Sequence, residues 1–321
     1  MGERVLIALG GNAMTSPDGS ASPDDQRRAV EQAMAHVATL VQAGHEVMLT
    51  HGNGPQVGNI LLKNQLAAPV VPPVPLDWCV AQTQGTIGML IMAALEAALV
   101  PRPVRVATVV TRTLVDRDDP AFADPVKPIG KYFPEADARR FEKLGQRWKA
   151  FDRGWRRVVA SPEPIEILDA PAAIALMEAG YIVVAAGGGG VPVARNTDGT
   201  LSGVEAVIDK DLAAAVMARA VHATALVIAT DVPAAVAGYG TPAARPIGRV
   251  GVGELRNLQA AGHFASGSMG PKVEAALRFV EDGGRRAVIT SLEHIGSALG
   301  ETAGTPETTD TTGVIGTILE K

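Results

Sequence analysis

Three short apolar runs in the sequence each end in a cluster of glycines. Residues 5–12 read VLIALGGN, the run 46–50 is followed by His-Gly-Asn-Gly at 51–54, and the run 182–186 is followed by four glycines at 187–190. Apolar runs of this length, bounded by glycines, predict buried strands. Because open α/β folds bind ligands at the carboxyl ends of parallel strands, the three clusters predict one ligand-binding edge.

The first two clusters supply residues that we expect to contact an anionic ligand. Glycines lack a Cβ, so their backbone N–H groups can approach an anion closely, and a following helix directs its positive end at the same point. A tight turn between a strand and a helix needs the same residues, but the repetition favours a binding edge. The candidates are Gly10, Gly11, Asn12, Gly52, Asn53 and Gly54.

The order of the first elements predicts a parallel sheet. Ser22, followed by Pro23 and two acidic residues, is a helix start with an N-cap and a favourable first-turn charge. The apolar residues of this helix share one face, and Gly44 ends it before the second apolar run. A strand, a helix and a second strand form a βαβ unit, which predicts an α/β fold.

Composition limits the class of protein. With 321 residues, 47% hydrophobic and 4% aromatic, the chain can bury a large aliphatic core in one large domain or two lobes. A net charge of −5 gives no reason to expect nucleic acid or an anionic membrane as a partner. The single cysteine, Cys79, excludes an intrachain disulfide framework. With no signal-peptide or membrane-spanning run, we expect a cytoplasmic protein.

Two segments depart from a plain α/β pattern. Residues 116–164 are rich in charges and aromatic residues and predict a small subdomain that projects from the sheet. Lys127 lies there between loop-forming residues and could reach a site, whereas the GWRR sequence at 154–157 could be only a solvated face. The long apolar segment 77–99 predicts a helix that packs against the sheet or a twin subunit, with Cys79 as a buried structural thiol.

Two further segments carry charges suited to phosphate. Lys210 stands between Asp209 and Asp211 at a predicted helix start, a grouping that is costly to bury but useful near phosphate and a metal ion. An exposed helix start would use the two acids as caps and give Lys210 no favourable role, because a cation opposes the helix dipole there. Lys272 ends the sequence SGSMGPK before another helix, an anion-binding arrangement of modest specificity by itself.

Long motifs now carry a resemblance to a known family. The sequences ALGGNA at 8–13, THGNGPQVGN at 50–59, KPIG at 127–130, GWRRVVASP at 154–162, GGGGVPV at 187–193, GVEAVIDKD at 203–211 and AGHFASGSMGPK at 261–272 resemble the carbamate kinases of the amino-acid kinase family, in the family's order. The resemblance implies a three-layer αβα sandwich around an open, mainly parallel sheet, and a homodimer. It also implies Mg²⁺-dependent phosphoryl transfer between ATP and carbamate, giving ADP and carbamoyl phosphate.

The resemblance also implies residue roles within one amino-acid kinase domain covering 1–321. Gly10, Gly11, Gly52 and Asn53 would hold the transferred phosphate, and Lys210 and Lys272 would neutralise it. Asp211 would position these lysines, and Lys127 would enter from the projecting subdomain. An N-terminal lobe of about 1–215 would bind the acceptor, and a C-terminal lobe of about 216–321 the nucleotide. The implied nucleotide contacts are Asp231, Tyr239, Gly240, Met269 and Gly270. No protein ligand to the metal is implied.

The sequence departs from relatives at two places. Many relatives carry a lysine where this chain has Ala8, which leaves Lys127 to supply that charge. The chain reads Thr-Asp-Val-Pro at 230–233, where relatives usually place a second acid after the valine, and its Thr-rich tract at 302–312 is longer than the usual connection.

Three other functions stay open. A kinase for another carboxylate or phosphate acceptor would share the fold and the lysines. A dinucleotide-dependent oxidoreductase would suit a glycine-rich α/β chain, but the sequence contains no G-x-G-x-x-G. A nucleotide sensor without catalytic activity would be favoured by loss of Lys210, Asp211 or Lys272, and all three are present.

Overall fold

The computed structural model describes residues 2–11, 22–264, 269–300 and 315–321. Its centre is an eight-stranded sheet with the order β15-β17-β16-β12-β1-β2-β9-β3. All neighbours are parallel except β16 and β17. The strands are β1 (Arg4–Leu9), β2 (Glu46–His51), β3 (Arg105–Thr108), β9 (Tyr181–Val184), β12 (Ala225–Thr230), β15 (Arg249–Gly251), β16 (Arg286–Ser291) and β17 (Thr317–Glu320).

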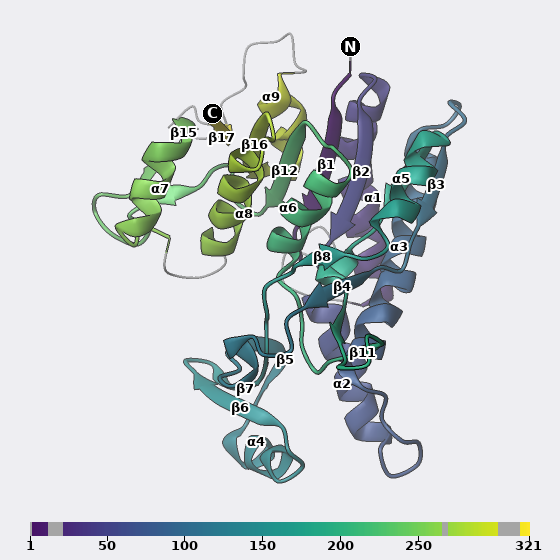
Figure 1. The fold of residues 1–321 in the computed structure, drawn as a ribbon, viewed down its shortest axis with the longest axis vertical. Coiled ribbons are helices and arrows are strands. Elements are labelled where there is room, and N and C mark those ends of the chain that lie inside the picture. Colours follow the sequence, from purple (N-terminus) through teal and green to yellow (C-terminus); the bar gives the residue numbers. More distant parts are fainter. Residues whose placement is uncertain (1, 12–21, 265–268, 301–314) are drawn as a thin grey trace.

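Helices cover both faces of this sheet, as the sequence predicted (Figure 1). Alternate residues of β1 divide between two cores: Leu6 and Ala8 pack with one set of helices, and Val5 and Ile7 with the other. The first set is α5 (Ala170–Glu178), α6 (Lys210–Ala220), α7 (Val252–Ala260) and α8 (Met269–Glu281). The second is α1 (Pro23–Gln42), α3 (Leu76–Ala98) and α9 (Ile295–Leu299). The predicted three-layer αβα arrangement is therefore confirmed.

The helix starts follow the sequence signals. Ser22 is the N-cap of α1 and accepts a hydrogen bond from the Asp25 N–H, as predicted. The helix expected from 273 begins earlier, at Met269, because Pro271 lies in the first turn, where no intrahelical N–H is required.

A smaller sheet contains β4 (Arg112–Val115), β8 (Glu166–Ile167), β10 (Val191–Arg195) and β11 (Leu201–Gly203). Strands β10 and β11 pair as an antiparallel ribbon.

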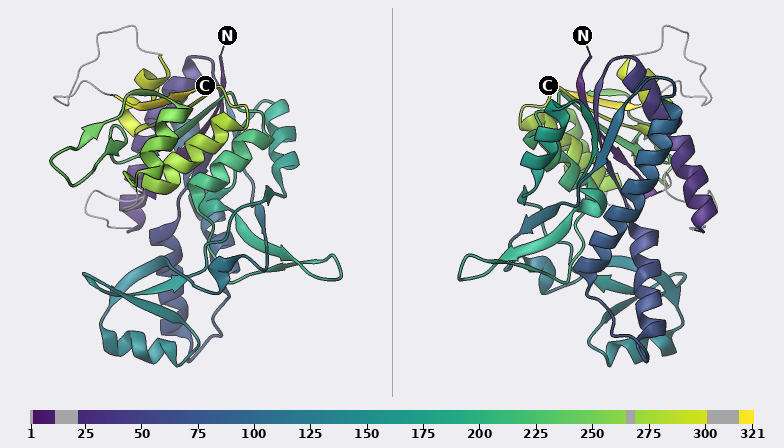
Figure 2. Two further views of the ribbon diagram at one scale, coloured as in Figure 1. Left: turned by 60° about the vertical axis from the view of Figure 1, so that its left-hand side comes forward. Right: turned by 90° about the vertical axis from the view of Figure 1, so that its right-hand side faces the viewer.

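The predicted subdomain projects beyond the edge at which β1 and β2 end (Figures 1 and 2). It consists of the antiparallel strands β5 (Lys127–Phe133), β7 (Gly154–Val159) and β6 (Arg147–Phe151), with α4 (Glu135–Glu142) on the side away from the main body. Phe133 and Trp148 pack against each other and against Phe141 of α4. This aromatic cluster explains why the segment has few aliphatic residues yet forms a compact unit.

The subdomain rests on α2 (Gly54–Ala67), which leads out of the second glycine cluster. A separate apolar core joins them, and buried Cys79 of α3 belongs to it, as predicted for a structural thiol. The short pair β13 (Val236–Ala237) and β14 (Arg245–Pro246) lies in the C-terminal part. Asn12 and the Thr-rich tract lie outside the described residues.

Helix α3 is the one helix in the described residues that is long and apolar enough to cross a membrane by length and composition. Half of that stretch, 50%, is buried inside the fold. Ile87, Ile91 and Leu95 occupy the core beside α1 and the central sheet. Its apolar character is therefore explained to this extent by packing within the protein.

Candidate active site

A pocket of about 350 Å³ lies at the sheet edge predicted from the glycine clusters. The adjacent strands β1, β12 and β16 all end there. It is lined by Gly10, Gly11, Lys210, Ala229, Thr230, Asp231, Lys272, Ser291, Leu292 and Glu293. The sequence interpretation had singled out both glycines, both lysines and Asp231. It missed Ser291 and Glu293, whose position just after an apolar strand was the available signal.

Asp211 joins the two lysines of the pocket. Lys210 Nζ lies 2.5 Å from Asp211 Oδ1, and Lys272 Nζ lies 3.1 Å from Asp211 Oδ2. Asp211 is 3% exposed and Lys272 6% exposed, and the Lys210 side chain is 13% exposed, so two of the charges are buried and the third is largely covered. Lys210 and Lys272 thus present two ammonium groups at the wall of the pocket, held close together by Asp211. An anionic group entering the pocket can bind to both through charge-assisted hydrogen bonds.

The ionisation of this triad follows from burial and its partners. Burial opposes ionisation of Asp211, but the charges of Lys210 and Lys272 outweigh it and hold the pKa of the carboxyl below its usual value. Burial lowers the pKa of Lys210, an effect opposed by the Asp211 charge and reinforced by Lys272. Asp211 therefore remains the anion that permits two ammonium groups to stand together.

Asp209 links the helix start to the projecting subdomain. As the N-cap of α6, its Oδ1 accepts hydrogen bonds from the backbone N–H groups of Asp211 and Leu212. Its Oδ2 lies 2.8 Å from Lys127 Nζ. The Lys127 side chain is 38% exposed and is not among the residues that line the pocket. Lys127 therefore lies at the rim of the candidate site, where its partner Asp209 caps the helix that carries Lys210 and Asp211.

The glycines of the first two clusters permit close approaches at this edge. A Cβ on Gly10 would lie 2.9 Å from the Ala229 carbonyl oxygen, so any larger residue would push β1 from β12. A Cβ on Gly52 would lie 3.6 Å from Lys210 Cδ. The Gly52 N–H already donates to the Leu9 carbonyl at 3.0 Å, so this residue contributes close approach and not a donor. The start of α2 at Gly54 supplies the helix end of the cluster.

The third glycine cluster supports the second one. A Cβ on Gly187 would lie 2.2 Å from His51 Nε2, and one on Gly188 would lie 2.2 Å from Asn53 Nδ2. Asn53 Nδ2 also donates to Thr83 Oγ1 at 2.9 Å. These glycines therefore admit the His51 and Asn53 side chains and fix the loop between them. The presence of glycine at positions 187 and 188 is therefore explained by packing, without a ligand.

His51 is buried and uncharged in the folded protein. Burial lowers its pKa to about 4, against a smaller raising effect of its contact with the Gly52 carbonyl and a further lowering by the Lys210 charge. Its Nδ1 lies 2.9 Å from that carbonyl oxygen. A neutral imidazole can hold the glycine loop without adding a third cation beside Lys210 and Lys272.

The depressed pKa of His51 predicts an acid-sensitive fold. Between pH 6.5 and about 4 the unfolded chain binds a proton at His51 and the folded chain does not, so stability falls as pH drops through that window. At about 1.4 kcal/mol per pKa unit, the expected loss is about 3 kcal/mol. Urea unfolding across this range should show a shallower pH slope for His51→Gln than for wild type. His36→Gln on α1 is the control, and equal slopes for all three proteins would contradict the prediction.

Several predicted nucleotide contacts do not line the pocket. Tyr239 is largely exposed and, with Gly240, occupies the connection between β13 and β14. Gly270 lines a different cavity of about 410 Å³ between α6, α7 and α8, and Met269 packs against the apolar core. Of the predicted nucleotide residues, the pocket therefore contains only Asp231.

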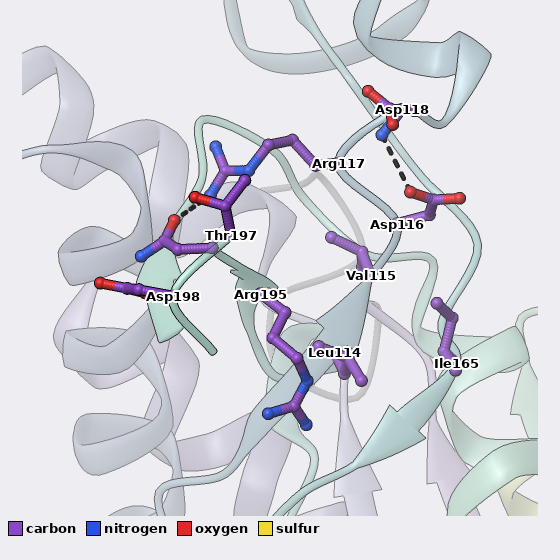
Figure 3. A pocket seen from close by; sticks show the side chains of 10 residues that line it. Leu114, Val115, Asp116, Arg117, Asp118, Ile165, Arg195, Thr197 and Asp198 are labelled. Carbon is purple, nitrogen blue, oxygen red and sulfur yellow. Dashed lines mark hydrogen bonds between the residues drawn. The ribbon is translucent and has the colours of Figure 1, made fainter. Parts of the chain in front are cut away.

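A larger hollow of about 760 Å³ lies beside the turn that joins β10 and β11, next to the end of β4 (Figure 3). Arg117 on its wall donates to Asn196 Oδ1 and Ser202 Oγ at 2.8 Å each, so this guanidinium is engaged within the ribbon. Asp116, Asp118 and Asp198 add negative charge. Among the described residues, none of the predicted site residues lines this hollow, whereas the smaller pocket contains Gly10, Gly11, Lys210, Lys272 and Asp231.

Carboxylates in the described residues do not form a metal cage. No group of three or more His, Cys, Asp or Glu side chains is placed there to hold an ion. Asp231 and Glu293 do line the pocket that contains the two lysines. Mg²⁺ commonly binds through one or two carboxylates together with substrate phosphates, so this donor set fits a metal that arrives with a nucleotide.

Comparison with known proteins gives a consistent assignment. The sequence model of the amino acid kinase family matches residues 3–291. A carbamate kinase of Thermococcus kodakarensis is 46% identical over 311 residues, covering 94% of this chain and 98% of that protein. A carbamate kinase from Giardia lamblia, solved with AMP-PNP bound, is 40% identical and superimposes with a TM-score of 0.89 over 100% of this chain and 99% of that chain.

The fold and the matched residues define the class. The chain belongs to the amino acid kinase family, and within that family to the group of carbamate kinases. A further relative, carbamate kinase 1 of Enterococcus faecium, is 46% identical over 306 residues and covers 97% of that protein.

Proposed function

We propose that this protein is a carbamate kinase that transfers a phosphoryl group reversibly between ATP and carbamate, giving ADP and carbamoyl phosphate. The observation that carries the proposal is the buried arrangement of Lys210, Asp211 and Lys272 at the glycine-lined sheet edge. The full-length similarity to carbamate kinases supports the choice of acceptor.

The residues supply charge and position, which are the main requirements of phosphoryl transfer. Lys210 and Lys272 neutralise the charge on the moving group, and Asp211 fixes the separation of their ammonium groups. Gly10, Gly11 and the helix start at Gly54 leave room for phosphate oxygens at the backbone. Carbamate is already an anion that attacks through oxygen, so no general base is required.

Lys127 completes the proposed set of cations from outside the pocket. Its strand β5 belongs to the projecting subdomain, whereas its partner Asp209 caps the helix that carries Lys210 and Asp211. The ammonium is thus held at the rim, beside the residues that would meet the transferred group. We propose that it stabilises charge on that group in the transition state.

Mg²⁺ would accompany the nucleotide phosphates, with Asp231 and Glu293 as the available protein carboxylates. When bound, the ion neutralises phosphate charge and orients the transferred group.

We propose that residues of about 216–321 hold the nucleotide and those of about 1–215 the acceptor, since the pocket lies where β1 meets β12. A cytoplasmic location suits the reduced, buried Cys79.

The decisive experiment is ATP formation by purified protein from ADP and carbamoyl phosphate. Activity with carbamoyl phosphate, and none with acetyl phosphate or an acyl phosphate of an amino acid, is expected. Preference for one of those donors would support a kinase with another acceptor. ADP binding without turnover of any donor would contradict the proposal and favour a nucleotide sensor.

We also propose that two copies associate through α3. Trp78 and Met89 are 60% and 57% exposed and stand three helical turns apart, so they share the outer side of the helix. Exposed apolar side chains in such a row are typical of an interface.

Sedimentation of the wild type at micromolar concentration should therefore show a dimer, and Met89→Glu should shift it to monomer because a buried charge is costly at an interface. Leu66→Glu, on exposed α2, is the matched control and should leave the dimer intact. A monomeric wild type would rule out this interface.

A further inference from the structure

Helix α2 and strand β5 cross with their backbones in contact. A Cβ built on Gly58 would lie 2.6 Å from Gly130 Cα and 3.1 Å from Gly130 N. Both neighbours are backbone atoms, so a side chain at 58 cannot be accommodated by a rotamer change. Gly130 itself has φ of +70°, a left-handed conformation that favours glycine. The two glycines therefore allow a contact that other residues would prevent.

This crossing lies between two parts of the proposed catalytic machinery. Gly58 stands about one helical turn beyond Gly54, where α2 leaves the second glycine cluster. Gly130 follows Lys127 by three residues on β5. A shift of β5 away from α2 would therefore also move Lys127, because it lies close to Gly130 on the same strand. The distance between Lys127 and Asp209 in their ion pair would change with it.

Strand β7 also contacts Gly130, through the side chain of Arg156. Arg156 donates from Nε and one Nη to the Gly130 carbonyl oxygen at 3.1 and 2.8 Å. The buried residues Val57, Ile129 and Val159 pack around the crossing in one apolar core. Gly130 is thus clamped between the backbone of α2 and the guanidinium of Arg156.

We propose that Gly58, Gly130 and Arg156 are positioning residues that act through Lys127: they set the distance of Lys127 from the reacting phosphoryl group. The inference rests on the phosphoryl transfer proposed above and adds residues that touch neither substrate. It requires that loosening the crossing lower the chemical rate and leave nucleotide binding unchanged, because a displacement of about 1 Å at a catalytic group can cost about 10²-fold in rate.

The first test is Gly58→Ala, with Gly253→Ala as the matched control. Gly253 also lies within a helix, α7, but nothing stands within 4 Å of a Cβ built there. We expect kcat for ATP formation to fall about 10-fold in Gly58→Ala and to remain near wild type in Gly253→Ala. The ADP dissociation constant should change by less than about 2-fold in both.

A double-mutant cycle separates positioning from general destabilisation. If Gly58 acts through Lys127, adding Gly58→Ala to Lys127→Ala should cause no further loss of kcat. A loss of the same factor with and without Lys127 would overturn the inference. A wild-type protein that forms no ATP would instead overturn the proposed reaction and this inference with it, so the two failures are distinguishable.

Arg156→Gln provides a second variant should Gly58→Ala fail to fold. This substitution removes the guanidinium that makes two hydrogen bonds to the Gly130 carbonyl oxygen, and Arg156 is partly exposed. It should also lower kcat, but only when Lys127 is present. Arg153→Gln is its control, because Arg153 and Arg156 stack on the same Tyr132 ring, at 5.0 and 5.1 Å. Equal losses in these two variants, or a loss that persists without Lys127, would overturn the clamp.

Discussion

Asp211→Asn should reduce turnover about 10³-fold while changing ADP affinity little, the largest effect expected from a single substitution in this protein. The change removes the charge that holds Lys210 and Lys272 together, while the glycine-loop donors are not altered. An asparagine can accept from one of the two lysines, but its NH2 group would face the other ammonium group, so both the charge and one acceptor are lost. Steady-state kinetics in the ATP-forming direction and a separate ADP titration measure the two quantities.

The same substitution should lower the free energy of unfolding by about 3 kcal/mol, because it leaves two buried ammonium groups without their anion. Part of this cost is relieved if Lys210, whose pKa burial already lowers, gives up its proton. Asp282→Asn, which breaks an exposed pair with Arg219, is the control and should change stability little. Equal losses of turnover and ADP affinity, or no loss of either, would contradict the role assigned to Asp211.

Lys127→Ala should lower kcat and kcat/KM together by about 10²-fold, as expected for a group whose interaction strengthens in the transition state. ADP affinity should be retained because Lys127 does not line the pocket. Its ion pair with Asp209 is more than one-third exposed on the lysine side, so stability should change little.

Lys149→Ala is the matched control for this variant, since Lys149 lies in the same subdomain and pairs with Asp124 at the surface. A raised KM for carbamoyl phosphate with unchanged kcat would show that Lys127 captures substrate in the ground state. That result would refute its catalytic assignment.

The local features of this protein were predictable because they depend on near neighbours in the sequence. The apolar runs before the glycine clusters form β1, β2 and β9, and Ser22 caps α1. The change of composition after residue 116 marks the projecting subdomain. The predicted pairing of Lys210 with Asp211 joins adjacent residues at a helix start, where backbone geometry alone keeps them close.

Only the tertiary structure decided which residues far apart in the sequence come into contact. Lys272 reaches Asp211 across 61 positions because α8 packs beside α6. Lys127 reaches Asp209 across 82 positions because β5 pairs with β7, and Ala160 just after β7 accepts a hydrogen bond from the Val207 N–H. Helix and strand periodicity indicate which face is buried but not which neighbour it meets.

The glycines show the same division between sequence and structure. The sequence marked three clusters as one ligand edge, yet Gly187 and Gly188 admit the His51 and Asn53 side chains, and the Gly52 N–H donates to the Leu9 carbonyl. A glycine in a sequence is compatible with a close approach, with a positive φ or with open space at that position. Which atom makes the approach, a ligand, a side chain or the backbone of a crossing helix, depends on how the layers pack in three dimensions.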